Sequence, residues 1–287
     1  MKIALVGSTG YIAGFLIERF NENKAIESVL KIGHSITADK QLSLTEPELF
    51  DYSLLNDVDY VIFTAAVSSP DRCASDDEVC WKINVEGTSY FIEKALQNHC
   101  RVLFFSSDAV FGDIPGCIYD EKSQTQPRTA YGKMKKAVED RFKEECDFKA
   151  IRLSYVTSSK DKFVSYCLSC LRSGTLAEVF HPFYRNCISV SDVVDVVEWL
   201  INHWDSYKPF ALNVAGKELV SRVRIADEIN RISGEKLKYV IVQPEDNFYR
   251  NRPQITQMRS IYLDQYDIIE NNTFTEKIQK ELGELSL

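Results

Sequence analysis

The chain has 287 residues, of which 45% are hydrophobic and 26% are charged, so it is long enough to bury a sizeable core in one large domain or two lobes. Its formal net charge of −8 argues against DNA, RNA or an anionic lipid surface as the main partner. The longest apolar runs are far shorter than the roughly 20 residues that a membrane helix needs. Met1 and Lys2 lead directly into a strand-like run with no signal peptide, so we expect a cytoplasmic protein.

Neither the cysteines nor the histidines predict a metal site. Cys167 and Cys170 form a C-x-x-C pair inside a predicted helix, but no second pair stands at zinc spacing. The four histidines are isolated from one another in the sequence. In a cytosolic protein, scattered cysteines of this kind are typical of reduced thiols.

The first half of the chain alternates predicted strands and helices. Apolar runs predict strands at residues 2–6, 28–32, 59–66, 101–106 and 149–153, and helical periodicity predicts helices at 11–21, 76–99 and 129–145. This alternation is typical of an α/β fold with a doubly wound parallel sheet and right-handed crossovers.

After Val156 the pattern is less regular. It predicts helices at 163–173, 191–204 and 221–233, with Ser221 as an N-cap, a strand at 210–214, and polar loops from Gln243 onward. We therefore expect a first domain at residues 1–156 and a smaller, discontinuous C-terminal lobe at 157–287. Segments at about 188–215 are expected to return to the first core.

The first predicted strand runs into a glycine turn, Gly7-Ser8-Thr9-Gly10, and a predicted helix follows. Gly7 can adopt the positive φ of a tight turn, and Gly10 lets the backbone approach a pyrophosphate at the helix N-terminus. Ala13 is small enough for the helix to pack on the strand, and Gly14 relieves crowding further. This context indicates a dinucleotide site rather than a merely structural turn. The expected contacts here are Gly7, Thr9, Gly10, Tyr11 and Ile12.

The second predicted strand ends without the Asp or Glu that holds the ribose 2′-hydroxyl in NAD-preferring sites. His34 and Ser35 stand there instead and would tolerate a 2′-phosphate, so the expected cofactor is NADP, with NAD as the alternative. Asp51 is placed either to reach the adenine or to lie in a solvated loop.

Tyr131 and Lys135 lie four residues apart and share one face of a predicted helix. An ammonium group lowers the pKa of a neighbouring tyrosine from its ordinary ~10, which makes the pair a candidate general acid and base. Such a pair also occurs by chance on exposed helices. Here, however, the fifth predicted strand ends in small hydroxyls, where ligands bind at the edge of a parallel sheet. Ser107 would hydrogen-bond the same substrate carbonyl oxygen that Tyr131 meets.

The chain resembles the extended short-chain dehydrogenases and reductases that act on nucleotide-sugars, and the likeness covers most of the chain up to about residue 233. The matching features are the glycine turn, Thr64-Ala65-Ala66, Asn84-Val85-Glu86-Gly87-Thr88, Ser106-Ser107-x-x-Val110-Phe111-Gly112, Tyr131-Gly132-x-x-Lys135, Arg152-Leu153-Ser154-x-Val156, Ile188-x-Val190-x-Asp192-Val193 and Asn213-Val214.

The resemblance implies a Rossmann domain that binds NAD(P) at residues 1–156 and a substrate-binding lobe at 157–287. It implies that Asn84 joins Ser107, Tyr131 and Lys135 in the catalytic group by supporting the proton relay. It also implies that Ala65, Ala66, Tyr131 and Lys135 contact the cofactor. The family usually has Asn where Thr64 stands and Gly where Ala13 stands, and both departures are mild.

The residues after Ser107 separate the reactions of this family. Its 4,6-dehydratases carry a glutamate, and its 3,5-epimerase/4-reductases a cysteine, at the position of Ala109. Asp108, followed by Val110 and Phe111, is closest to the dTDP-4-dehydrorhamnose reductase group, although a cap or loop carboxylate is an equal alternative. The resemblance therefore implies NAD(P)H-dependent reduction of the 4-keto group of a nucleotide-activated 6-deoxyhexose, with Asp108 and Ala109 beside the substrate.

Arg185 and Arg252 are candidate contacts to the substrate diphosphate, because guanidinium groups match phosphate geometry, or else they are surface arginines. Two other functions remain open. One is a C4-epimerase with tightly bound NAD, which uses the same catalytic group. The other is a non-catalytic NAD(P)-binding regulatory protein, against which the intact Ser107, Tyr131 and Lys135 argue.

We also expect a homodimer. In relatives, helices corresponding to about 85–99 and 131–145 pair across a two-fold axis into a four-helix bundle. The candidate apolar surface is Phe91, Ile92, Leu96, Val138 and Phe142, unless these side chains only pack inward.

Overall fold

The computed structural model describes residues 1–283, and the chain divides into two units. Unit 1 comprises Met1–Gly112, Gln124–Arg152 and Glu198–Leu212. Unit 2 comprises Asp113–Ser123, Leu153–Val197 and the described residues from Asn213 onward. The boundaries fall inside α7 (Val190–Asn202) and β12 (Ala211–Val214), so single elements belong to both units.

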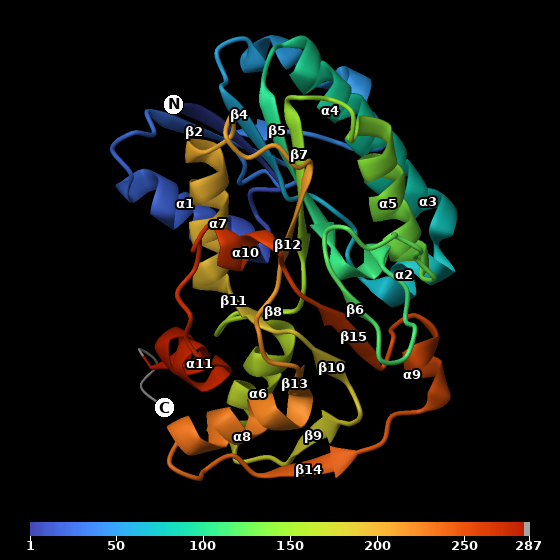
Figure 1. Ribbon diagram of the computed structural model, residues 1–287, viewed down its shortest axis with the longest axis vertical. Coiled ribbons are helices and arrows are strands. Elements are labelled where there is room, and N and C mark those ends of the chain that lie inside the picture. Colours follow the sequence, from blue (N-terminus) through green and yellow to red (C-terminus); the bar gives the residue numbers. More distant parts are fainter. Residues whose placement is uncertain (284–287) are drawn as a thin grey trace. The chain divides into compact units, whose positions relative to one another are not determined.

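A seven-stranded sheet forms the centre of unit 1, with the strand order β12-β7-β5-β4-β1-β2-β3 (Figure 1). The pairs β1–β2, β1–β4, β4–β5 and β2–β3 are parallel. The central strands β1, β4 and β5 are short, largely apolar runs that are almost entirely buried, as a parallel sheet covered on both faces requires. Besides β12, the strands are β1 (Lys2–Val6), β2 (Ser28–Gly33), β3 (Lys40–Gln41), β4 (Tyr60–Phe63), β5 (Arg101–Ser107) and β7 (Phe148–Leu153). The predicted α/β fold is therefore confirmed.

The predicted fourth strand is too long. β4 ends at Phe63, and the next residue already leaves the ladder: the Thr64 hydroxyl and the Thr64 amide both donate to the Val6 carbonyl oxygen, each at 2.8 Å. Residues 64–66 are therefore free to form a loop at the carboxyl edge of the sheet, although their composition resembles that of the strand before them.

The helices of unit 1 are α1 (Tyr11–Glu22), α2 (Pro70–Ser75), α3 (Asp77–Trp81), α4 (Thr88–Gln97) and α5 (Ala130–Phe142), with the end of α7. The long helix predicted at 76–99 is helical from Asp77 to Gln97, but a π-helical segment, η3 (Lys82–Gly87), lies between α3 and α4. At the end of η3 a Cβ on Gly87 would lie 1.9 Å from the Leu44 carbonyl oxygen. The backbone thus approaches the 42–45 loop more closely than any side chain would permit.

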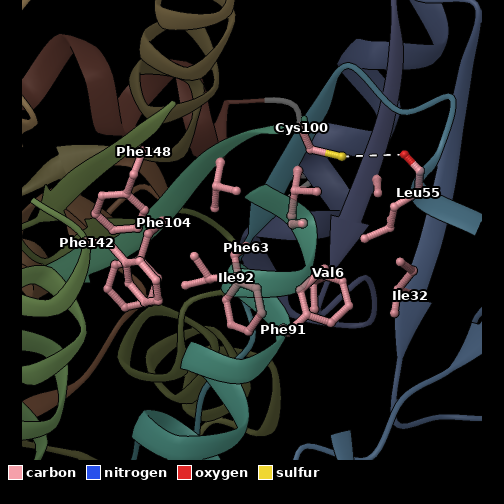
Figure 2. Close-up of a cluster of buried hydrophobic side chains, with 14 of the residues drawn as sticks. Val6, Ile32, Leu55, Phe63, Phe91, Ile92, Cys100, Phe104, Phe142 and Phe148 are labelled. Carbon is pink, nitrogen blue, oxygen red and sulfur yellow. Dashed lines mark hydrogen bonds between the residues drawn. The ribbon is translucent and has the colours of Figure 1, made fainter. Parts of the chain in front are cut away.

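A cluster of buried aromatic side chains joins the sheet to α4 and α5 (Figure 2). The Phe104 and Phe148 rings of the sheet stack at 6.0 Å between centroids, and Phe63 and Phe91 lie 5.7 Å apart. At the edge of the cluster the Cys100 thiol donates to the Leu55 carbonyl oxygen at 3.5 Å.

The surface predicted for a dimer is wrong, because its side chains belong to this core. Phe91, Ile92, Val138 and Phe142 are buried within unit 1, and Leu96 packs against the same cluster. These five side chains therefore pack within one chain, which was the alternative to a dimer surface.

Unit 2 contains several small sheets and helices. Its four-stranded sheet has the order β13-β10-β15-β6, and the pairs β8–β11 and β9–β14 are parallel. Its elements are β6 (Ile118–Tyr119), β8 (Val156–Thr157), α6 (Lys162–Ser173), β9 (Ala177–Phe180), β10 (Tyr184–Arg185), β11 (Ile188–Ser189), most of α7, the end of β12, β13 (Val220–Ser221), α8 (Arg222–Ile232), β14 (Tyr239–Val242), α9 (Asp246–Arg250), β15 (Ile255–Met258), α10 (Tyr262–Gln265) and α11 (Phe274–Leu282). The predicted cap is confirmed, since the Ser221 hydroxyl accepts from the Arg224 amide at 3.0 Å.

Residues 113–123 belong to unit 2 although they interrupt unit 1 in the sequence. Glu121 anchors the segment 113–123 to the rest of unit 2. Its carboxylate accepts hydrogen bonds from the Asn213 amide at 3.0 Å, the Ser260 hydroxyl at 2.6 Å and the Ile261 amide at 2.8 Å. The prediction that loops dominate from Gln243 onward is wrong, because strand formation there depends on residues far away in the sequence. β15 takes its hydrogen bonds from β10 and β6, far away in the sequence. None of the helices in the described part of the chain is long and apolar enough to cross a membrane.

Candidate active site

The glycine turn lies between β1 and α1. Gly7 has φ +86°, and a Cβ there would lie 2.6 Å from the Ala65 amide nitrogen, so both conformation and space require glycine. The Gly10 amide closes the turn by donating to the Gly7 carbonyl oxygen at 2.8 Å, and Gly10 is the N-cap of α1. The first-turn amides of a helix have no acceptor within the helix, so this end of α1 favours an anion.

Ala13 is fully buried, as the packing of α1 requires, but the predicted role of Gly14 is wrong. A Cβ on Gly14 would meet nothing within 4 Å. Gly14 therefore relieves no crowding.

A cavity of about 460 Å³ opens beside the glycine turn. Its lining residues are Val6, Gly7, Thr9, Gly10, Gly33, His34, Leu42, Ser43, Leu44, Thr45, Thr64, Ala65, Ala66, Val67, Arg72 and Ile83, all in unit 1. The cavity brings together six of the residues predicted to bind the cofactor: Gly7, Thr9, Gly10, His34, Ala65 and Ala66. Tyr11, Ile12, Ser35, Asp51, Tyr131 and Lys135, which were also predicted to contact the cofactor, do not line it.

The charges of this cavity suit an anion. Among its described lining residues Arg72 is the one permanently charged side chain, and none is a carboxylate. Arg72 lies on α2, a short helix that the sequence pattern did not predict, so Arg72 was not among the predicted site residues. The hydroxyls of Ser43 and Thr45, 2.8 Å apart, form another wall that the sequence analysis missed. A short edge strand, β3, precedes this wall and carries too little pattern to mark it.

The end of β2 places His34 at the cavity without an acidic neighbour in the lining. The nearest acid in the sequence, Asp39, is paired instead with Lys31, whose ammonium lies 3.3 Å from its carboxylate. Asp51 has a local role: its carboxylate caps the turn at 52–55 and accepts from the Ser53 amide at 3.1 Å and the Ser53 hydroxyl at 2.6 Å. These hydrogen bonds lower the pKa of Asp51.

Ser107 lies at the carboxyl end of β5 and begins a tight turn. Its hydroxyl accepts from the Ala109 amide at 3.2 Å and donates to the Asp108 carboxylate at 3.1 Å. Helix α5 begins close to this turn, since a Cβ on Gly132 would lie only 2.0 Å from the Ala109 carbonyl oxygen. Gly132 therefore allows the first turn of α5, which carries Tyr131, to pack directly on residues 107–110.

Lys135 follows one helical turn after Tyr131 and points back to the same strand. Its ammonium donates to the Phe105 carbonyl oxygen at 2.7 Å and lies 5.8 Å from the centroid of the Tyr131 ring. Lys135 is 2% exposed, and burial lowers its pKa from 10.5 to about 7. The group therefore exchanges its proton near neutral pH, where a relay needs it.

The pKa of Tyr131 departs from the sequence prediction. Burial raises it, and the nearby Cys73 thiol and Asp108 carboxylate raise it further. The lowering expected from Lys135 is therefore wrong, because burial has the largest effect on the pKa of Tyr131 and disfavours the phenolate. Tyr131 consequently holds its proton, which is the form that donates.

Asn84 lies within η3 and is 2% exposed. Its side chain grips one peptide unit of the loop after β4: its oxygen accepts from the Val67 amide at 2.8 Å, and its nitrogen donates to the Val67 carbonyl oxygen at 2.9 Å. Val67 lines the cavity, so these two hydrogen bonds of Asn84 hold part of the cavity lining in place. Val67 and Tyr131 both pack against the buried cluster of Cys73, Cys80 and Met134.

Two arginines predicted to meet the substrate diphosphate, Arg185 and Arg252, lie in unit 2. Arg185 is buried and donates to the backbone carbonyl oxygens of Tyr184 at 2.6 Å and Pro253 at 2.8 Å. Arg252 lies over the Phe248 ring at 4.9 Å. A third arginine, Arg222, is stacked against the same ring at 5.7 Å; as the first residue of α8 it had no distinguishing signal in the sequence.

Comparisons with known proteins agree with this geometry. A family model described as the RmlD substrate binding domain matches residues 1–287. A curated dTDP-4-dehydrorhamnose reductase from Aggregatibacter actinomycetemcomitans is 25% identical over 136 residues, which are 47% of this chain. The match spans only 44% of that relative's length.

Three solved structures share the fold over nearly the whole chain. A dTDP-4-dehydrorhamnose reductase from Clostridium acetobutylicum has a TM-score of 0.82 and 20% identity over 100% of both chains. The enzyme of that name from Bacillus anthracis, solved in complex with NADP, has a TM-score of 0.82 and 18% identity over 99% of both chains. A UDP-glucose 4-epimerase from Thermotoga maritima, solved with UDP-glucose, has a TM-score of 0.80 and 16% identity over 99% of this chain and 98% of that one.

Proposed function

Because the chain belongs to the family of the RmlD substrate binding domain, we propose that it is an oxidoreductase that uses NADPH to reduce the 4-keto group of a nucleotide-activated 6-deoxyhexose. The observation that carries the proposal is the packing of α5 on the turn at 107–110. That packing brings Ser107, Tyr131 and Lys135 to one edge of the sheet. The reductases named among its relatives support the choice of reaction.

The residues of unit 1 suit the cofactor. Gly7 lets the turn pack directly against Thr64 and Ala65, and Gly10 presents the N-terminus of α1 to the pyrophosphate. Arg72 neutralises part of the phosphate charge. The cavity edge at His34 accepts a 2′-phosphate because no carboxylate faces it among the described lining residues. NADPH supplies the hydride that reaches C4.

The chain supplies the proton and holds the sugar oxygen. Ser107 donates a hydrogen bond to O4 of the substrate, and Tyr131 transfers its phenolic proton to the same oxygen as the carbon is reduced. Lys135, behind Tyr131, stabilises the phenolate and returns a proton to it from solvent. One hydride and one proton are consumed for each ketone reduced. The methyl group of Ala109 has no acid or base function, which supports reduction without removal of a carbon-bound proton.

Unit 2 is the proposed binding region for the sugar nucleotide. Arg222, partly buried beside aromatic rings, is its candidate cation together with Arg252 and Arg185. Asp108 and Ala109, next to Ser107, are the proposed contacts to the sugar. We also propose that the enzyme is cytoplasmic and forms a homodimer; sedimentation as a monomer at micromolar concentration would contradict the dimer.

Purified protein should consume NADPH with a panel of nucleotide 4-keto-6-deoxysugars, followed at 340 nm, and the product should be identified by NMR. Tyr131→Phe is the matched control, since it removes one oxygen atom and should abolish turnover. A protein that instead retains NAD through purification and interconverts C4 epimers would refute the reductase and favour a C4-epimerase, the activity named for one of the structural relatives. Cofactor binding without turnover of any such sugar would point to a regulatory protein.

A further inference from the structure

A second pair of charged side chains lies beneath the catalytic helix. Glu139 of α5 and Arg152 of β7 are both nearly inaccessible, with side chains 3% and 4% exposed. The guanidinium binds the carboxylate with two nitrogens, Nη2 at 2.6 Å from Oε2 and Nε at 3.1 Å from both oxygens. The reaction proposed above does not use either residue.

Glu139 continues the face of α5 that carries the catalytic group. Tyr131, Lys135 and Glu139 are each four residues apart, so they follow one another along one side of the helix, about 6 Å per step. The same strand holds the last two: the Phe105 carbonyl oxygen accepts from Lys135 at 2.7 Å, and the adjacent Ser106 hydroxyl donates to Glu139 at 2.5 Å. Strand β5 therefore holds the ammonium and the carboxylate through two consecutive residues.

Packing alone does not explain why an ion pair is buried at this place. Burying two charges adds little net stability compared with apolar side chains of similar size. Arg152 lies over the rings of Phe111 at 5.2 Å and Phe210 at 5.5 Å, and its Nη1 has no hydrogen-bond partner. An apolar residue would suit that aromatic environment at least as well, so the reason for the pair should lie in the charge of Glu139.

We propose that Glu139 is a positioning residue of the catalytic group, whose carboxylate, held by Arg152 and Ser106, keeps the ammonium charge on Lys135 beside Tyr131. The inference rests on the proposed function for its catalytic consequence. Its electrostatic part does not need that function, because the contacts on α5, β5 and β7 do not depend on which substrate is bound.

Of the described groups that act on Lys135, Glu139 has the largest favourable effect. Burial lowers the pKa of Lys135, and Glu139 and then Cys73 raise it. The Cys73 thiol, on α2, is itself neutral near pH 7, because burial raises its pKa to about 12. The other neighbours are the neutral phenol of Tyr131 and the amide of Asn84, which lies 3.9 Å from the Cys73 sulfur. Glu139 is therefore the carboxylate on which the charge of Lys135 depends.

The first test measures the titration of Lys135 directly, in protein labelled with ¹³C at the lysine Cε and without any substrate. Lys135→Met assigns the resonance. In Glu139→Gln, which keeps the shape and the acceptor oxygen, Lys135 should titrate about 1 pH unit or more below its value in the wild type. The matched control is Glu198→Gln, which removes a carboxylate from another ion pair of unit 1, with Arg19 at 2.9 Å, and should leave Lys135 unchanged.

Two further variants separate charge from folding. Glu139→Asp keeps the carboxylate and should restore most of the wild-type titration. Glu139→Gln/Arg152→Met leaves no unpaired buried charge, so it should fold even where the single variant does not, and Lys135 should still titrate lower. A folded double variant in which Lys135 titrates as in the wild type would overturn the proposal.

The second test is the pH profile of kcat/KM for NADPH oxidation. In Glu139→Gln the limb at high pH should move to lower pH by the same amount as the Lys135 titration, whereas a merely structural defect would lower the rate equally at every pH. A lowered titration of Lys135 without a shifted limb would refute the catalytic consequence. Failure of the wild type to turn over any sugar would refute the reductase alone, because the titration decides the role of Glu139 without it.

Discussion

Replacing Lys135 by methionine should change how the stability of this protein depends on pH. In the folded chain burial lowers the pKa of Lys135 to about 7, whereas in the unfolded chain it returns to about 10.5. Between these two values the unfolded state binds a proton that the folded state lacks. Lys135 therefore makes the free energy of unfolding rise as the pH increases through this window, and the gain is lost as the pH falls toward 7.

The size of the effect follows from the two pKa values. One proton corresponds to about 1.4 kcal/mol per pH unit, so the difference of 10.5 − 7 = 3.5 allows at most about 5 kcal/mol. Between about pH 7.5 and pH 9.5 the wild type should gain about 2.5 kcal/mol relative to Lys135→Met, which has no proton to bind.

Urea unfolding followed by tryptophan fluorescence at the two pH values measures this difference, with equal m-values as the condition for comparing them. Lys133→Met is the control, since Lys133 lies on the same helix but is exposed, and it should follow the wild type. If Lys135→Met and the wild type change in parallel with pH, Lys135 is not the buried, proton-poor group described here.

Three other changes test the site. Tyr131→Phe should reduce turnover by roughly 10²–10⁴-fold with NADPH affinity nearly unchanged, because phenylalanine has no proton to donate; turnover close to that of the wild type would exclude Tyr131 as the acid. His34→Asp should reverse or reduce a preference for NADPH over NADH, because the added carboxylate repels the 2′-phosphate. Equal use of both cofactors by the wild type would show that the loop at His34 does not discriminate between a 2′-phosphate and a 2′-hydroxyl on the ribose. Arg72→Met should weaken NADPH binding in calorimetry, most at low salt, whereas Arg141→Met, which removes an exposed arginine paired with Glu93, should not; an unchanged Kd would remove Arg72 from the cofactor site.

The parts of the fold that the sequence predicted correctly depend on near neighbours in the chain. The run Lys2–Val6 followed by Gly7 predicted both β1 and the turn, because apolar composition and a required positive φ are local properties. The spacing of Tyr131 and Lys135 placed both on one helix for the same reason. Ser107 was found because a strand that ends in hydroxyls marks the edge of a parallel sheet.

The errors fall where distant residues decide the local structure. The interruption of the long helix at η3 goes with the contact of Gly87 to Leu44, which no pattern within residues 76–99 reveals. β15 was assigned to a loop because its hydrogen-bonding partners, β6 and β10, are remote in the sequence. Phe142 was assigned to a dimer surface because helical periodicity shows which residues share a face but not what that face packs against.

By itself, the sequence determined the class of fold and the tight glycine turn, and it predicted Ser107, Tyr131 and Lys135 as the catalytic group, since each is written in the order and spacing of a few adjacent residues. Only the tertiary structure decided that Arg72 enters the cofactor cavity, that burial raises rather than lowers the pKa of Tyr131, and that Glu139 and Arg152 lie buried beneath Lys135. The physical reason is that burial and Coulomb interactions depend on distances through space. Those distances exist only once strands and helices far apart in the chain have packed together.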